Sequence, residues 1–422
     1  MIKRFNLFLM LLFCSFMVFA QQTYGSLKTK GDAAYDNKAY VEATTYYIKA
    51  FELGKPDPGD VYNLACCYAL IQDQDNAFKY LKMAVDHGFT NTNWMRQDSD
   101  LNYLHQFPEW KQTIQYSEKG RITAEKGINS KLKLELINMK KEDQELRRLA
   151  IDLMKQPELQ DSLNKVWDQV TAIDIRNTKR MKEIVYKYGW PTKSLVGNEG
   201  SAAAWLLVQH ADLDPKFQAK CLDLMGKHLA NNEVSKKNYA YLYDRVKTGQ
   251  AELQMYGTQA GDNPMTGKTT FLPIKDESNV DARRAEVNIT KTAKEYAAQM
   301  GFEYELPSKE DAQQQQLERD QFYAEQIKKA KDSYKAGRRP QALESYRAAL
   351  RIYGSINNED LLEGAAVAAE FGQEAEDNAF WWLGKLMARG ENVANQVEQD
   401  QRFEAILQSE RWSDLKAMMQ TP

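Results

Sequence analysis

Small and hydrophobic residues recur at helical spacing along most of the chain, and near the N-terminus they recur in pairs of helices. In residues 27–89 the pattern has a period of 34. The positions at offsets 0, 12, 16 and 19 are Gly31, Ala43, Tyr47 and Ala50, and then Ala65, Ala77, Leu81 and Ala84. Small residues let two helices pack closely, and the large residue fills the groove between them. The pattern therefore predicts two consecutive helix hairpins.

The same pattern returns near the C-terminus. Residues 320–352 carry Ala330, Ala342, Tyr346 and Ala349 at the same offsets. Beyond them, matching residues stand 302 positions apart without a gap: Asp75 and Asp377, Ala77 and Ala379, Leu81 and Leu383, Gly88 and Gly390, Asp98 and Asp400, Trp110 and Trp412. We therefore expect a duplicated module, made of helix hairpins and a short closing segment, on both sides of a central region.

The central region has helical periodicity without the 34-residue repeat. Apolar stripes predict helices over about 130–155 and 158–188, a helix over 201–212, one that starts near Asp214-Pro215 and one that ends at Gly249. Residues 253–259 and 269–274 read as two short strands of a β-hairpin, and a last helix is expected over about 280–300. The predicted fold class is all-α, with helical-repeat modules flanking a central helical domain that carries one small β-hairpin.

The N-terminus has the features of a signal peptide. Lys3 and Arg4 precede an apolar run from Phe5 to Phe19, and Val18-Phe19-Ala20 is a suitable cleavage site before Gln21. The predicted division is residues 1–20 as signal peptide, 21–118 as N-terminal module, 119–307 as central domain and 308–422 as C-terminal module. We expect an exported protein, periplasmic or secreted, with no membrane span after cleavage.

Composition narrows the classes of function. The chain is 43% hydrophobic and 27% charged, which is ordinary for a folded protein, and its formal net charge of −3 argues against a nucleic-acid partner. Cys66, Cys67 and Cys221 remain after cleavage, and an odd number does not form a disulfide framework. We interpret them as small buried residues. The four histidines show no metal-ligand spacing, so the sequence predicts neither a metal site nor a cofactor.

Polar residues interrupt the apolar stripes of three central helices. Asp143 is followed one turn later by Arg147, Asp174 by Asn177, and His210 continues the stripe of Leu206 and Leu207. Buried polar groups need partners, so these side chains are expected to meet. Two interpretations stay open: a satisfied network that fixes helix register, or the floor of a pocket in which His210 and Asp174 are candidate catalytic groups.

Two resemblances add to this picture. The repeated modules resemble tetratricopeptide repeats. Residues of about 130–305 resemble a bacterial family of unknown function, number 6624, through Asp143-Gln144 with Arg147, Asp174 with Asn177, Gly189-Trp190-Pro191, Gln209-His210-Ala211-Asp212, Asp244-Arg245 and Tyr256-Gly257-Thr258-Gln259. The second resemblance implies one domain type, often exported and sometimes joined to tetratricopeptide repeats, but no activity. Asp143, Arg147, Asn177, Gln209, Tyr256 and Gln259 are candidate ligand-binding residues.

Two further motifs carry less weight. Gly261 to Thr269 resembles a phosphate loop, but five residues instead of four separate its glycines and no helix is expected after it. The tandem Trp381 and Trp382 are either core residues or anchors for a bound peptide, and we treat them as candidate partner-binding residues.

Three functions remain open from the sequence. The leading hypothesis is an exported binding or scaffold protein whose repeats hold a protein or peptide and whose central domain adds a ligand-binding or regulatory site. The alternative is a hydrolase-like enzyme with His210 as acid or base. A third possibility is an assembly protein whose two modules pack on each other.

Overall fold

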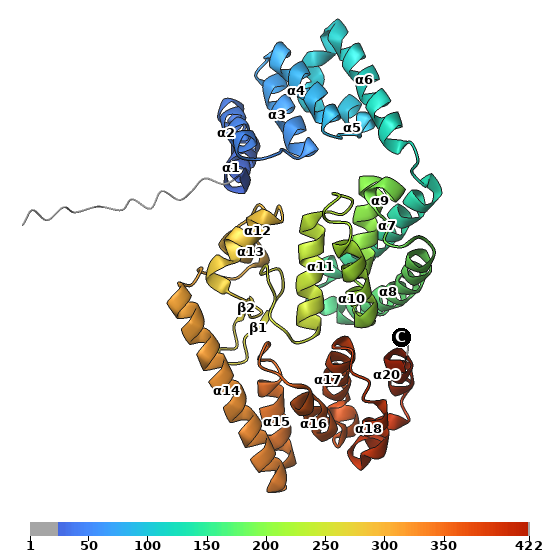
Figure 1. Cartoon of the computed structure of the whole chain (residues 1–422), viewed down its shortest axis with the longest axis vertical. Coiled ribbons are helices and arrows are strands. Elements are labelled where there is room, and N and C mark those ends of the chain that lie inside the picture. Colours follow the sequence, from blue (N-terminus) through green and yellow to red (C-terminus); the bar gives the residue numbers. More distant parts are fainter. Residues whose placement is uncertain (1–23, 421–422) are drawn as a thin grey trace, which may run out of the picture.

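A computed structural model describes residues 24–420, and most of these residues are helical. The predicted signal peptide, residues 1–20, lies outside the described part. The N-terminal module, the central domain and the C-terminal module follow one another along the long axis of the molecule (Figure 1). Within the described part, no helix combines the length and apolarity that crossing a bilayer requires. The predicted helical fold class with one small hairpin is confirmed.

The N-terminal module consists of two helix hairpins and a closing segment. Its elements are α1 (Tyr24–Asp36), α2 (Tyr40–Leu53), α3 (Pro58–Leu70), α4 (Gln74–Asp86), α5 (Thr92–Gln97), η1 (Ser99–Gln106) and α6 (Pro108–Glu125). The repeated positions after Gly31 are fully buried between the helices. A Cβ atom on Gly31 would lie 3.0 Å from the ring of Tyr47, so glycine allows this close approach of α1 to α2 without a shift of the ring. The predicted boundary at residue 118 falls inside α6.

The C-terminal module repeats this order with two differences, an added η4 and a closing segment divided into η5 and α19. It consists of α14 (Lys309–Lys335), α15 (Arg339–Ala349), α16 (Asn358–Ala369), η4 (Gly372–Glu374), α17 (Glu376–Ala388), α18 (Ala394–Gln399), η5 (Gln401–Phe403), α19 (Glu404–Leu407) and α20 (Glu410–Gln420). Helices α17 and α18 begin and end 302 residues after α4 and α5. Asp98 and Asp400 make equivalent hydrogen bonds, because each side chain accepts a hydrogen bond from the main-chain N–H of the residue two positions later. The offset of 302 residues that relates the two modules in the sequence therefore also relates the positions of their helices.

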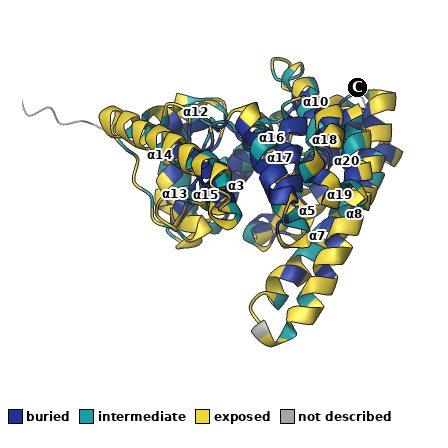
Figure 2. Cartoon of the chain, turned by 90° about the horizontal axis from the view of Figure 1, so that it is seen from below, coloured by how far each residue is buried: buried dark blue, intermediate teal, exposed yellow. Residues whose placement is uncertain are grey.

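The central domain packs helices around one core and sends out a long helix hairpin. Its elements are α7 (Ser130–Leu153), η2 (Pro157–Leu159), α8 (Gln160–Tyr188), α9 (Lys193–Gln209), α10 (Pro215–Gly226), α11 (Lys236–Gly249), β1 (Ala260–Asp262), β2 (Thr269–Phe271), η3 (Glu277–Asn279), α12 (Val280–Glu286) and α13 (Ala293–Met300). Leu136, Met181, Leu207 and Cys221 meet in the core. The distal parts of α7 and α8 extend away from it with exposed outer faces (Figure 2).

Three local predictions were wrong in their boundaries. The helix expected over 201–212 begins at Lys193, bends at Gly197 and ends at Gln209. The helix expected over 280–300 is two helices, because Asn288 has a positive φ and Thr292 starts α13 with a capping box. The β-hairpin exists, but its first strand is residues 260–262 and not 253–259.

Residues 255–258 are not a strand because side chains, and not a neighbouring strand, satisfy their main chain. The buried carboxylate of Asp244 accepts from the N–H groups of Met255, Tyr256 and Thr258 and from the hydroxyl of Thr258. On the other side, Arg283 and Arg284 donate to the carbonyls of residues 255, 256 and 257. The loop is therefore held between one carboxylate and two guanidinium groups.

The C-terminal module is fixed to the end of α11. The Lys385 ammonium donates to the Thr248 carbonyl over 2.8 Å, Arg389 donates to the Gln250 carbonyl over 2.7 Å, and the Gly354 N–H donates to the Ala251 carbonyl over 2.9 Å. Carbonyls at a helix C-terminus carry partial negative charge and need donors. Residues of the C-terminal module thus cap a helix of the central domain.

Lys385 is a buried cation without a carboxylate among its hydrogen-bond partners. It is 8% exposed, and its Nζ lies 4.7 Å from the centre of the Trp381 ring and 5.2 Å from that of Tyr353. Burial lowers the pKa of Lys385 to about 8. The residue 302 positions earlier is Met83, so the same place in the other module holds an apolar side chain.

We predict that Lys385→Met makes the protein more stable at pH 7, by roughly 1–3 kcal/mol, because it removes a desolvated charge. The Thr248 carbonyl keeps the Ala251 N–H as a donor. Between pH 8 and 10.5 the folded wild type releases its Lys385 proton before the unfolded chain does, so wild-type stability rises there relative to the variant. Urea unfolding against pH measures both effects. The exposed Lys329→Met is the control, and a destabilised Lys385→Met with unchanged pH dependence would contradict the prediction.

Candidate functional site

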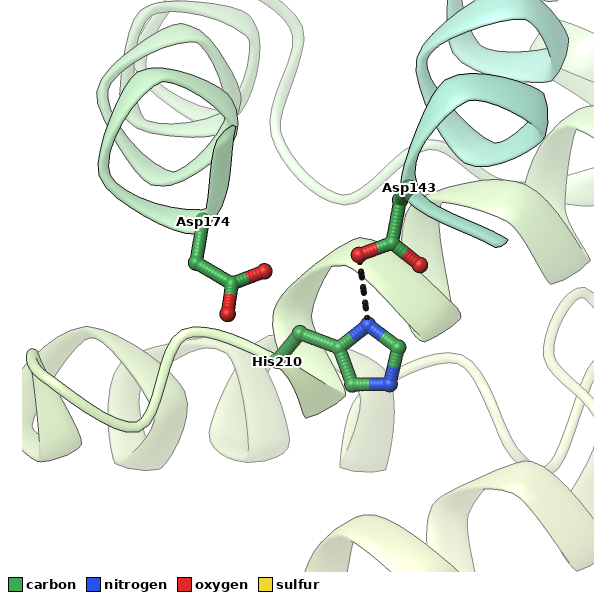
Figure 3. A group of neighbouring side chains, drawn as sticks. All are labelled: Asp143, Asp174 and His210. Carbon is green, nitrogen blue, oxygen red and sulfur yellow. Dashed lines mark hydrogen bonds and ion pairs between the residues drawn. The ribbon is translucent and has the colours of Figure 1, made fainter. Parts of the chain in front are cut away.

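Three helices bring Asp143, Asp174 and His210 together in the central domain (Figure 3). On α7, Leu136, Asp143 and Ala150 follow each other at seven-residue intervals and are all buried, so Asp143 takes a core position. Asp174 comes from the middle of α8. His210 is the first residue after α9, where its N–H still donates to the Leu206 carbonyl. The chain leaves the helix there and starts α10 at Pro215.

The Asp143 carboxylate connects these side chains. Its Oδ1 accepts from His210 Nδ1 over 2.9 Å and from Arg147 Nε over 3.1 Å, and its Oδ2 accepts from Gln144 Nε2 over 2.8 Å. Arg147 Nη2 in turn donates to both oxygens of Asp174, over 2.6 and 2.8 Å. The predicted pair of Asp143 and Arg147 is confirmed, and Asp174 and His210 join it in one network.

The two carboxyl groups have opposite pKa shifts. Burial alone raises the pKa of Asp143, but the hydrogen bonds from His210 and Gln144 and the charge of Arg147 outweigh it and lower the pKa to about 2. Burial raises the pKa of Asp174, and Arg147 only partly opposes this effect. Asp143 is therefore firmly ionised, whereas Asp174 is the carboxyl group of the pair that is more easily protonated.

His210 is oriented by Asp143 and keeps one ring nitrogen open. An ionised carboxylate can only accept, so Nδ1 carries the proton toward Asp143 and Nε2 carries a lone pair. Within residues 24–420, no side chain or main-chain group is hydrogen-bonded to Nε2. The side chain of His210 is 17% exposed, so the nitrogen is not sealed in the core. This arrangement can accept a proton, donate one or hold a bound group.

The other candidate residues of the central domain divide into two groups. Asn177 is 2% exposed, and its Nδ2 has no hydrogen-bond partner in the described part of the chain. Gln209 is also buried, and its carbonyl accepts from Gln218. Tyr256 and Gln259 are not in the His210 network. They belong to the loop held by Asp244, where Gln259 accepts from Arg245 over 3.5 Å.

A second polar cluster lies two residues beyond His210 along the chain. Asp212 accepts from Arg245 and from Gln218, over 3.1 Å in the second case. The Asp212 side chain is 54% exposed, and its partial desolvation, which raises the pKa, is outweighed by the hydrogen bonds from Arg245 and Gln218 and the charge of Arg245, which lower the pKa. Sequence reasoning quoted Asp212 and Arg245 in motifs but did not pair them. The two residues are 33 positions apart, and no periodicity of the sequence links them.

The tandem tryptophans have different surroundings. Trp382 is 1% exposed and lies in the core of the C-terminal module, so the proposal that it anchors a partner is wrong. Trp381 is 39% exposed and its ring covers the ammonium of Lys385. Cys66, Cys67 and Cys221 are buried free thiols, as expected.

The sequence did not predict the one group of possible metal ligands in the described residues. Ligand atoms of Asp143, Asp174 and His210 all lie within 4.8 Å of one another. They are an imidazole nitrogen and two carboxylate oxygens, the donor set that zinc and its neighbours accept. Asp143 lies on α7, Asp174 lies on α8 and His210 directly follows α9, so no short spacing in the sequence indicates the group.

Comparisons with known proteins match the central region only. Residues 130–309 match a family described as a family of unknown function (DUF6624). No curated protein and no solved structure matches the chain. The predicted resemblance of the central domain is therefore confirmed, and the match covers all of Asp143, Arg147, Asp174, Asn177 and His210.

We predict that Asp143→Asn removes the contribution of Asp143 to the pH dependence of the free energy of unfolding. Because the pKa of Asp143 is about 2 in the folded protein and near 3.8 in the unfolded chain, its ionised form stabilises the fold above pH 4, by about 2 kcal/mol. This contribution disappears as the pH falls from 4 to 2. The variant should be less stable than wild type at pH 7, and the difference should shrink toward pH 2. Urea unfolding measures it, with the exposed Asp152→Asn as control. An equal difference at both pH values would refute this role.

Proposed function

We propose that the chain is an exported binding protein in which modules of the tetratricopeptide-repeat type take up a protein or peptide and the central domain holds a ligand at His210. Export follows from the signal peptide that the sequence predicts. The repeat identity rests on the spacing of small residues and on the buried helix hairpins that this spacing produces.

The observation that carries the ligand site is the oriented imidazole of His210. Asp143 fixes its tautomer, and Nε2 is left without a hydrogen bond in the described part of the protein. A partly exposed nitrogen beside two carboxylates and a guanidinium group is suited to recognise a polar ligand.

The modules differ in how free they are for a partner. In the C-terminal module, Lys385 and Arg389 are bound to α11, so part of α17 is covered by the central domain. In the N-terminal module, Trp94 on α5 is 54% exposed. Exposed tryptophan is favoured at protein interfaces. We therefore propose the N-terminal module as the main partner-binding module, with Trp381 as a smaller candidate surface.

An acid–base enzyme of the hydrolase class is the second candidate. The pair of His210 and Asp143 supports it, because a carboxylate that orients an imidazole also stabilises its protonated form during proton transfer. Asp174 and Arg147 would then position the substrate. The binding protein and the enzyme both use His210, but only the enzyme would convert its ligand into a product.

One comparison of variants tests both candidates. We predict that His210→Ala stays folded, with a Tm within a few degrees of wild type, and loses every saturable ligand-induced Tm shift found for wild type in a library of small polar metabolites. His228→Ala, a histidine outside the network, should keep those shifts. Turnover of p-nitrophenyl esters or phosphates by wild type and not by His210→Ala would decide for the enzyme. If His210→Ala keeps both the shifts and the turnover, the site is not at His210.

A further inference from the structure

The structure assigns a divalent metal ion, with Zn²⁺ as its best representative, to the centre formed by Asp143, Asp174 and His210, where the ion replaces the guanidinium group of Arg147. This inference deepens the proposed function, because it rests on the ligand site at His210 and names the chemical class of its ligand.

The separation of the ligand atoms fits one ion. Asp143 Oδ1 and His210 Nδ1 are 2.9 Å apart. At the tetrahedral angle that zinc prefers, two ligand atoms about 2.1 Å from the ion are about 3.4 Å apart, so this pair needs to separate by only about 0.5 Å. An oxygen of Asp174 lies within 4.8 Å of both atoms, so a small movement of this side chain completes a set of three ligands. The ligands stand on α7, on α8 and directly after α9, which are packed against one another.

The charges of the centre favour a divalent ion over the guanidinium group. Two carboxylates and Arg147 leave one net negative charge when His210 is neutral. Asp143 is fully buried, and an uncompensated charge in such surroundings is costly. A divalent ion in place of Arg147 brings the formal charge of the three ligands and the ion to zero.

Arg147 is the member of the network that can leave. Among the described residues, all three of its hydrogen bonds go to the carboxylates of Asp143 and Asp174, and none goes to the main chain. Its side chain is 22% exposed, and it lies one turn from Asp143 on α7. A long side chain at this position can move its charged end into solvent. The buried carboxylate of Asp143 cannot do so.

Groups around the ligands suit a bound ion. Gln144 donates to the second oxygen of Asp143 and fixes the orientation of this carboxylate. Asn177 follows Asp174 by one turn on the same face of α8, and its buried Nδ2 lacks an acceptor in the described part of the protein. A water molecule on the ion can provide that acceptor. When Nδ1 of His210 binds the ion, the ring proton moves to Nε2, which then donates to a further ligand.

The test is metal binding to the full mature chain after chelator treatment, with ZnCl₂ as the probe. Isothermal titration calorimetry should give one site per chain, and the Tm should rise with zinc. Asp174→Asn and His210→Ala should weaken binding by about 100-fold or more. Arg147→Met should strengthen it by about tenfold, because the competing cation is gone. Glu142→Gln, an exposed neighbour on α7, should bind like wild type.

Two results overturn the inference: no saturable binding of zinc up to 1 mM by wild type and by Arg147→Met, or binding that Asp174→Asn and His210→Ala do not change. Circular dichroism shows whether a variant is folded. The tighter zinc binding expected of Arg147→Met is a gain, so a misfolded variant cannot imitate it. If zinc fails to bind while His210→Ala still removes metabolite-induced Tm shifts, the metal is wrong and the proposed function stands. If His210→Ala changes neither measurement, both are wrong.

Discussion

The central domain depends on one buried carboxylate that replaces an apolar side chain. Asp143 stands on α7 where the spacing of Leu136 and Ala150 calls for a core residue. An ionised group can occupy such a position only if donors surround it, and Asp143 is surrounded by His210, Arg147 and Gln144. These donors come from the same helix and from the end of α9, and Arg147 extends the network to α8. The requirement to satisfy one charge thus fixes the relative positions of three helices.

Sequence periodicity predicted the elements of this arrangement better than their contacts. The stripes of α7 and α8 gave both helices almost to the residue, and the four-residue spacing of Asp143 and Arg147 gave their ion pair. His210 was placed on a helix face, but it follows the helix, and 67 residues separate it from Asp143. No periodicity links such distant positions. The strand predicted over residues 253–259 is wrong for a related reason, because Asp244, Arg283 and Arg284 satisfy the main chain of residues 255–258 from outside the segment.

The duplicated modules show how one helical pattern serves different surroundings. Helices α4 and α17 have the same length and register, but α17 carries Trp381 and Lys385 where α4 carries Lys79 and Met83. In α17, Lys385 faces α11 and caps its C-terminal carbonyls, and the ring of Trp381 covers the Lys385 ammonium. The small residues that hold each module together are kept, while the outward positions differ with what each module meets. The core positions of the sequence therefore predicted the duplication, but they did not predict the contact between the C-terminal module and α11.

Two buried carboxylates of the central domain allow a comparison that separates structure from function. Asp244 accepts mainly from main-chain N–H groups of one loop, and these donors cannot leave without unfolding the loop. Asp143 accepts only from side chains, one of which is partly exposed and another of which keeps an open nitrogen. Both carboxylates are satisfied, but only the partners of Asp143 can be exchanged for a ligand while the helices stay in place. Such exchangeable partners distinguish a binding site from a structural clamp, and they support the ligand site that we propose at His210 over one at Asp244.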